Sequence, residues 1–83
     1  MAVDVLYFAW VRERVGLPRE RIETGAATMR DLLAELALRS PGHAAALGDH
    51  AALRCAIDQK LAGLDAPLAG AREVAIFPPM TGG

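Results

Sequence analysis

Val74-Ala75-Ile76-Phe77-Pro78-Pro79-Met80-Thr81-Gly82-Gly83 is the stretch of sequence that decides the fold. Its first four residues are apolar, as in a strand that is buried on both faces. The two prolines lack an N–H and fix φ, so they cannot continue a sheet ladder. We therefore predict a strand that ends at Phe77, a folded domain over residues 1–77, and a flexible tail over residues 78–83.

The tail has features that a disordered chain terminus does not require. From Pro78 onward it can reach at most about 20 Å, at about 3.3–3.6 Å per extended residue. Gly82 and Gly83 carry no side chain, so a terminal carboxylate could enter a narrow channel. A frayed terminus is the usual alternative. We favour a functional tail because the glycines follow a stiff double-proline spacer that comes directly after a strand.

Composition limits the classes of protein that this chain can be. With 83 residues it forms one small domain, and a hydrophobic content of 53% argues against disorder. The net charge of −1 gives no reason to expect nucleic acid or a membrane surface as partner. We see no apolar run that could span a bilayer and no signal-peptide pattern, and a single cysteine cannot form an internal disulfide. We therefore expect a cytoplasmic protein.

Further elements follow from hydrophobic periodicity and capping residues. The clearest is a helix capped by Thr28, in which four apolar residues form a stripe at i, i+3, i+4, i+7 spacing and which Ser40-Pro41-Gly42 ends. Strands are expected at residues 2–9, 19–23 (an edge), 53–58 and 74–77, a short return strand near Leu61, helical segments at 10–15 and 41–50, and a loop at 65–73.

This order predicts an α+β domain with a mixed sheet wrapped around one main helix. The first and last strands are the most apolar, so we place them side by side in the centre, and the helix between them makes them parallel. One helix covers one face. The other face keeps Phe8, Phe77 and Leu61 and is a candidate interaction site, unless residues 10–15 or 41–50 cover it.

No catalytic grouping stands out. His43 and His50 have no ligand partners at metal spacing, so we predict no metal site and read both as solvated. Cys55 is expected to be a small buried hydrophobic residue, and Lys60 a solvated lysine. A carboxylate is inert until it is activated, commonly by adenylation, and no ATP-binding motif is present. The chain is thus predicted to be a substrate or carrier for other enzymes.

The segment Val74 to Gly83 resembles the end of the MoaD family, the small sulfur-carrying subunits of molybdopterin synthase. Val5-Leu6-Tyr7-Phe8-Ala9, followed by Val11-Arg12-Glu13 and Val15-Gly16, is similar to the start of that family. The resemblance spans the chain and implies a ubiquitin-like β-grasp fold. It also implies a subunit that is not an enzyme alone and binds no cofactor.

The resemblance implies a mechanism as well. An E1-like adenylating enzyme uses ATP to activate the carboxylate of Gly83, and sulfur from a desulfurase or rhodanese-type donor converts it to a thiocarboxylate. The tail residues Pro78, Pro79, Met80, Thr81 and Gly82 would then enter a channel in the large catalytic subunit. There the sulfur passes to cyclic pyranopterin monophosphate during molybdenum cofactor biosynthesis, in a heterotetramer of two small and two large subunits.

Four further positions match the family's contacts with its partners. These are the apolar Phe8, Leu61 and Phe77, and the basic Arg12. The alternatives are a sulfur carrier of the thiamine pathway, a ubiquitin-like protein modifier, or a plain interaction module. The Phe-Pro-Pro-x-Thr-Gly-Gly tail argues against the first two.

Overall fold

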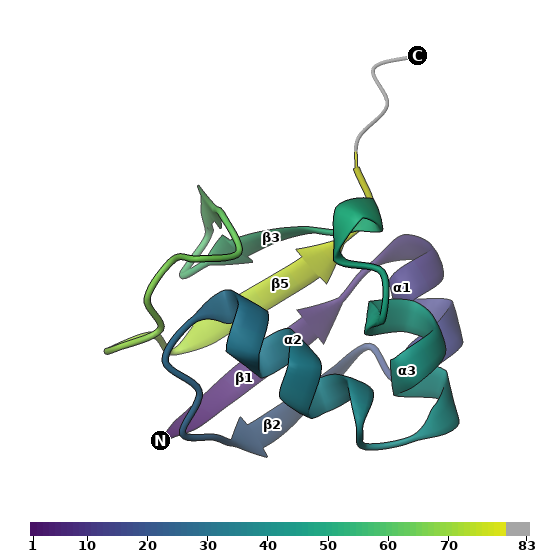
Figure 1. Ribbon diagram of the computed structural model, residues 1–83, viewed down its shortest axis with the longest axis horizontal. Helices are drawn as coiled ribbons and strands as arrows, with labels where there is room; N and C mark the ends of the chain where they lie inside the picture. The colour runs from purple at the N-terminus through teal and green to yellow at the C-terminus, as the bar shows by residue number, and fades with distance from the viewer. Residues whose placement is uncertain (80–83) are drawn as a thin grey trace.

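The computed structural model describes residues 1–79, so the predictions on Met80, Thr81, Gly82 and Gly83 lie outside the described residues. Within this range the elements follow one another as Figure 1 shows. In chain order they are β1 (Ala2–Tyr7), α1 (Ala9–Val15), β2 (Arg19–Glu23), α2 (Met29–Ala37), α3 (Pro41–Leu47), the 3-10 helix η1 (His50–Ala52), β3 (Arg54–Ile57), β4 (Lys60–Ala62) and β5 (Glu73–Phe77).

The strands form one mixed sheet in the order β2-β1-β5-β3-β4. β1 and β5 lie side by side in the centre and run parallel, while the other neighbours are antiparallel. The predicted placement of the first and last strands is thus confirmed, as are β2 as an edge strand and the end of β5 at Phe77. This is the α+β, β-grasp arrangement that the resemblance implies.

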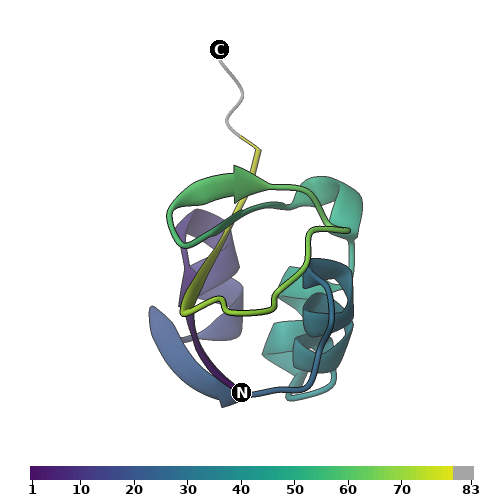
Figure 2. The ribbon, with the colours of Figure 1, turned by 90° about the vertical axis from the view of Figure 1, so that its left-hand side faces the viewer.

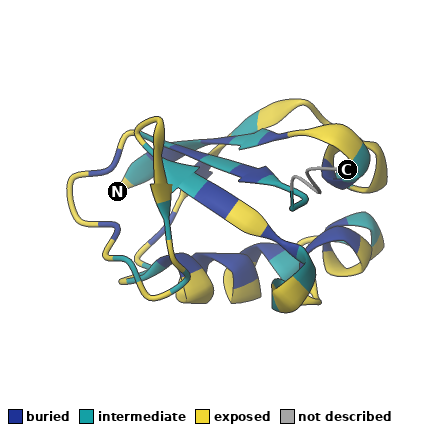
Figure 3. Ribbon diagram, turned by 90° about the horizontal axis from the view of Figure 1, so that it is seen from above, coloured by how far each residue is buried: buried dark blue, intermediate teal, exposed yellow. Residues whose placement is uncertain are grey.

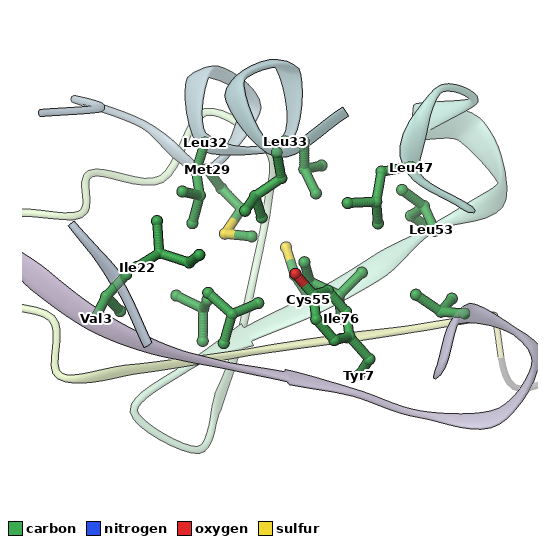
Figure 4. Packing of buried hydrophobic residues seen from close by; sticks show 14 of the residues in the cluster. Val3, Tyr7, Ile22, Met29, Leu32, Leu33, Leu47, Leu53, Cys55 and Ile76 are labelled. Carbon is green, nitrogen blue, oxygen red and sulfur yellow. The ribbon is translucent and has the colours of Figure 1, made fainter. Parts of the chain in front are cut away.

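Alternation along β1 and β5 separates the two faces of the sheet. Val5, Tyr7, Val74 and Ile76 are buried, whereas their neighbours in sequence are at least partly exposed. The buried side chains meet the apolar stripe of α2, and Figures 2 and 3 show the sheet curving over this helix. Figure 4 shows how the core is packed. The buried hydrophobic residues are Val3, Val5, Tyr7, Val11, Ile22, Met29, Leu32, Leu33, Leu36, Ala46, Leu47, Leu53, Cys55, Leu68, Ala71, Val74 and Ile76.

Capping residues fix the starts of two helices. The Thr28 hydroxyl accepts a hydrogen bond from the Asp31 N–H at 3.3 Å, as predicted. The predicted end of α2 was too late, because the helix stops at Ala37. Ser40 caps α3 by accepting from the His43 N–H, and Pro41 fills the first position of that helix, where no N–H is needed.

The segment between β4 and β5 contributes to the core although it contains no regular element. Leu68 is fully buried, and its N–H donates to the Ala27 carbonyl at 3.0 Å. The Arg30 N–H donates to the Leu64 carbonyl at 2.7 Å, so the segment also contacts the start of α2. The predicted loop is correct, except that Glu73 already belongs to β5. In the part of the chain that the structure describes, no helix is both long and apolar enough to cross a membrane.

Candidate functional site

The outer face of the sheet carries a row of apolar side chains. The strand register aligns Leu6, Ala75, Ala56 and Leu61 across β1, β5, β3 and β4. Leu61 is 82% exposed. The helices do not cover this row of side chains. α1 contacts α3 and the central strands β1 and β5, and α3 contacts α2. The interpretation of a sheet with one helix-covered face and one partly open apolar face therefore agrees with the structure.

A hollow lies at the end of this face where the tail begins. Leu61, Ala62, Gly63 and Phe77 line it together with Arg54 and Cys55, and its volume is about 470 Å³. Phe77 is half-buried and lies opposite Arg54 in the antiparallel register. Pro78 and Pro79 follow it outside any strand. Two of the predicted contact residues, Leu61 and Phe77, are therefore brought together beside the base of the tail.

The other two predicted contact residues lie apart from this hollow. Phe8 is 45% exposed and precedes α1, and its N–H donates to the Ile76 carbonyl at 3.1 Å. This bond keeps Phe8 near the end of β5. Arg12 is an exposed residue of α1 and lines a separate hollow with Glu13, Gly16, Leu17 and Pro18. The two hollows share no residue, so the structure does not bring Arg12 together with Leu61 and Phe77.

Cys55 is buried in β3, as predicted. Its thiol donates to the Ala62 carbonyl at 3.3 Å. Burial raises the pKa of Cys55, so little reactive thiolate forms at neutral pH. Among residues 1–79, no three His, Cys, Asp or Glu side chains gather in a way that could hold a metal ion. Lys60 is exposed, in agreement with its interpretation as a solvated lysine.

The prediction that His43 is solvated was wrong, and His50 is half-buried. The His43 side chain is 8% exposed, and its Nε2 lies 2.7 Å from a carboxylate oxygen of Glu20. Because a carboxylate only accepts, Nε2 donates this hydrogen bond. The Tyr7 hydroxyl donates to the same oxygen at 2.7 Å, and the Ser40 hydroxyl lies 2.7 Å from Nδ1. This polar cluster joins β1, β2 and α3, three elements that are distant in sequence.

The cluster favours the ionised form of Glu20. Burial by itself would raise the pKa of Glu20, but hydrogen bonds from His43 and Tyr7 and the nearby Arg39 outweigh it and lower that pKa. Burial and the Glu20 carboxylate both raise the pKa of Tyr7 far above its ordinary value, so its hydroxyl stays a donor. No buried side-chain polar atom in the described part of the chain lacks a partner. The cluster thus fixes α3 to the sheet and needs no ligand.

We expect Glu20→Gln to destabilise the domain by about 1–3 kcal/mol at pH 7, because a charge-assisted hydrogen bond is lost. The pKa of Glu20 is lowered on folding, so its contribution is present above the ordinary glutamate pKa and is lost as pH falls through the folded value. Urea unfolding at pH 7 and at about pH 3 should therefore show the difference between wild type and variant shrinking in acid. A difference that is constant with pH would contradict this interpretation of Glu20.

Comparisons with known proteins cover nearly the whole chain. A family model described as the ThiS family matches residues 5–83. The chain is 41% identical over 81 residues to the molybdopterin synthase sulfur carrier subunit of Escherichia coli (strain K12), covering 98% of this chain and 99% of that one. It is 36% identical, with the same coverage, to the protein of that name from Haemophilus influenzae. The crystal structure of small archaeal modifier protein 1 from Haloferax volcanii matches with a TM-score of 0.77 and 27% identity over 100% of both chains.

Proposed function

This chain belongs to the ThiS family, and on that premise we propose that it is the sulfur carrier subunit of a molybdopterin synthase. The observation that carries the proposal is that relatives covering 98% of the chain, at 41% and 36% identity, bear that name. The relatives are small carrier subunits, so the chain would act as a substrate and donor and not as an enzyme alone. We also place it in the cytoplasm, which its single cysteine favours.

The proposed chemistry is centred on Gly83. Its carboxylate oxygen attacks the α-phosphorus of ATP on an E1-like adenylating enzyme, and pyrophosphate leaves. A donor persulfide then attacks the acyl-adenylate carbon, AMP leaves, and an acyl disulfide forms. A thiol attacks the donor-side sulfur of this disulfide, which releases the thiocarboxylate and leaves the thiol oxidised in a new disulfide. The thiocarboxylate sulfur finally forms a C–S bond to cyclic pyranopterin monophosphate in the large subunit. Water then cleaves the acyl C–S bond of the resulting thioester, which leaves the sulfur on the product and returns Gly83 to a carboxylate. This chain binds no cofactor itself, since the ATP is bound and used by the adenylating enzyme.

The position of the tail supports this role. β5 is a central strand with neighbours on both sides, so its end at Phe77 is a fixed point from which the tail starts. The prolines stiffen the first tail residues, and residues 78–82 would occupy a channel in the partner. Leu61 and Phe77 would contact the partner beside the base of the tail, with Phe8 and Arg12 further along the surface. We propose a heterotetramer of two small and two large subunits.

A second candidate function is protein modification. It is favoured by the similarity to small archaeal modifier protein 1 at a TM-score of 0.77. In that role the activated Gly83 would form amide bonds to lysines of other proteins, and conjugates would appear on their lysines. A carrier for thiamine synthesis would instead bind thiazole synthase. The large synthase subunit and thiazole synthase, used as separate binding partners, distinguish the two carriers.

The decisive experiment is the intact mass of the full chain after incubation with its adenylating enzyme, ATP and a sulfur donor. We expect the mass of the chain to increase by the difference between one sulfur atom and one oxygen atom. Addition of the large subunit and cyclic pyranopterin monophosphate should then return the chain to its original mass and yield molybdopterin. An unchanged mass, with an enzyme and donor shown to be active on another carrier, would contradict the proposal.

A further inference from the structure

The hollow beside Phe77 adjoins a second one of about 430 Å³. The two share Arg54, Cys55, Ala62 and Gly63 in their linings. The second hollow is also lined by Arg30 and His50, whereas no aspartate or glutamate lines either of them. On a chain whose net charge is −1, this end of the sheet therefore collects groups that carry or can carry positive charge.

Arg54 is the charged residue common to both hollows and the one nearest to the base of the tail. It lies opposite Phe77, the last residue of β5, and its backbone is fixed by the β3–β5 ladder. Its Nη1 donates to the carbonyls of Leu53, at 2.8 Å, and Ala51, at 3.4 Å. Among residues 1–79, no carboxylate lies within ion-pair distance of this guanidinium. Arg54 is exposed, and its Nε and Nη2 make no hydrogen bond to another residue of the 1–79 range.

Arg30 differs from Arg54 because it has an ion-pair partner. Its Nε pairs with the Asp65 carboxylate at 3.0 Å. It therefore adds less uncompensated charge to the second hollow. The first hollow is lined both by the apolar Leu61 and Phe77 and by Arg54, which has no ion-pair partner among residues 1–79. Such a hollow is complementary to an apolar side chain that has a carboxylate beside it.

We propose that Arg54 binds an aspartate or glutamate of the large synthase subunit, and that the hollow between Leu61 and Phe77 takes an apolar side chain from the same segment of that subunit. This inference rests on the proposed function, since it specifies the partner surface that meets the base of the tail. Arg54 is a specificity residue in this view, because a partner without an acidic residue at that point leaves its donors unpaired.

The test measures binding of the full chain to the large synthase subunit at about 50 mM and about 500 mM salt. We expect Arg54→Met to weaken binding about tenfold at low salt and to flatten the salt dependence. Arg54→Lys keeps the charge but loses the planar fork, so it should recover part of the affinity. Arg72→Met is the matched control. Arg72 directly precedes β5, at the end of that strand opposite to Phe77, and its replacement should change neither quantity.

Two results would overturn the inference. One is Arg54→Met binding as tightly as wild type to the large subunit at low salt. The other is a loss of affinity with an unchanged salt dependence, which would mean that Arg54 acts only through the carbonyls of Ala51 and Leu53. If the wild-type chain gains sulfur and binds, these results leave the proposed function intact. A wild-type chain that neither gains sulfur nor binds would overturn both.

Discussion

A chain that lacks Gly83 is expected to gain no sulfur at all, while it keeps most of its affinity for the large subunit. The loss is complete because the deletion moves the terminal carboxylate back by one residue, about 3.5 Å along an extended chain. Adenylation requires reacting atoms to approach within about 3–3.5 Å, so a displacement of this size removes the reaction. Binding is kept because the apolar outer face and Arg54 belong to the folded domain and are unchanged.

The measurement is intact mass after the loading reaction, together with the affinity for the large subunit. Gly25→Ala is a suitable control, since Gly25 is an exposed glycine at which an added Cβ meets no atom within 4 Å. That variant should gain sulfur as wild type does. Sulfur on the chain without Gly83 would show that the modified group is not the terminal carboxylate of Gly83.

The parts of the fold that the sequence predicted are those that depend on neighbouring residues. Pro78 and Pro79 end β5 because of their own covalent geometry, and Thr28 caps α2 through a residue three positions away. The two-residue alternation of β1 and β5 separates the buried face from the open one. Such signals need no knowledge of the tertiary structure, and they were sufficient to place the parallel central strands.

The features that were missed depend on residues far apart in the chain. His43 is buried because Glu20, on another element, accepts its hydrogen bond. Gly42, interpreted as a helix end, instead lies where a Cβ would come within 2.5 Å of the Arg14 carbonyl of α1. Leu68 is buried because its loop folds back onto the residues before α2. No local pattern contains these contacts, so periodicity and capping could not reveal them.

The candidate site was partly predictable for the same reason. The alternation of apolar residues on the two faces of the predicted strands singles out Phe77 and Leu61 without a structure. Arg54 was passed over because its position beside them follows from strand register, which pairs it with a residue 23 positions later in the sequence. A predicted antiparallel pairing of the 53–58 strand with the last strand, aligned through their apolar residues, would have been the signal that revealed it.

Phe77→Asp is expected to weaken binding to the large subunit about a hundredfold, equivalent to about 2.8 kcal/mol, without unfolding the domain. Phe77 is half-buried on the outer face of β5, so its replacement costs about 1 kcal/mol of folding free energy, less than the loss of a fully buried side chain. In a complex the aspartate would replace the apolar contact beside Leu61 and would compete with the partner's carboxylate for Arg54, which lies opposite it, so binding loses far more than folding. Calorimetric binding and thermal unfolding of the same preparation measure both effects.

Two leucine variants separate a binding surface from a general effect of added charge. Leu61 and Leu38 are 82% and 88% exposed, so aspartate at either position leaves the core unchanged. Leu61 lines the hollow beside Phe77, whereas Leu38 is the C-cap residue that follows α2. Leu61→Asp should therefore weaken binding and Leu38→Asp should not. Equal affinities for these two variants would mean that the outer face is not the contact surface, because only a surface that meets the partner distinguishes two leucines of similar exposure. Global unfolding of Phe77→Asp would mean that Phe77 belongs to the core and that the outer face was misinterpreted.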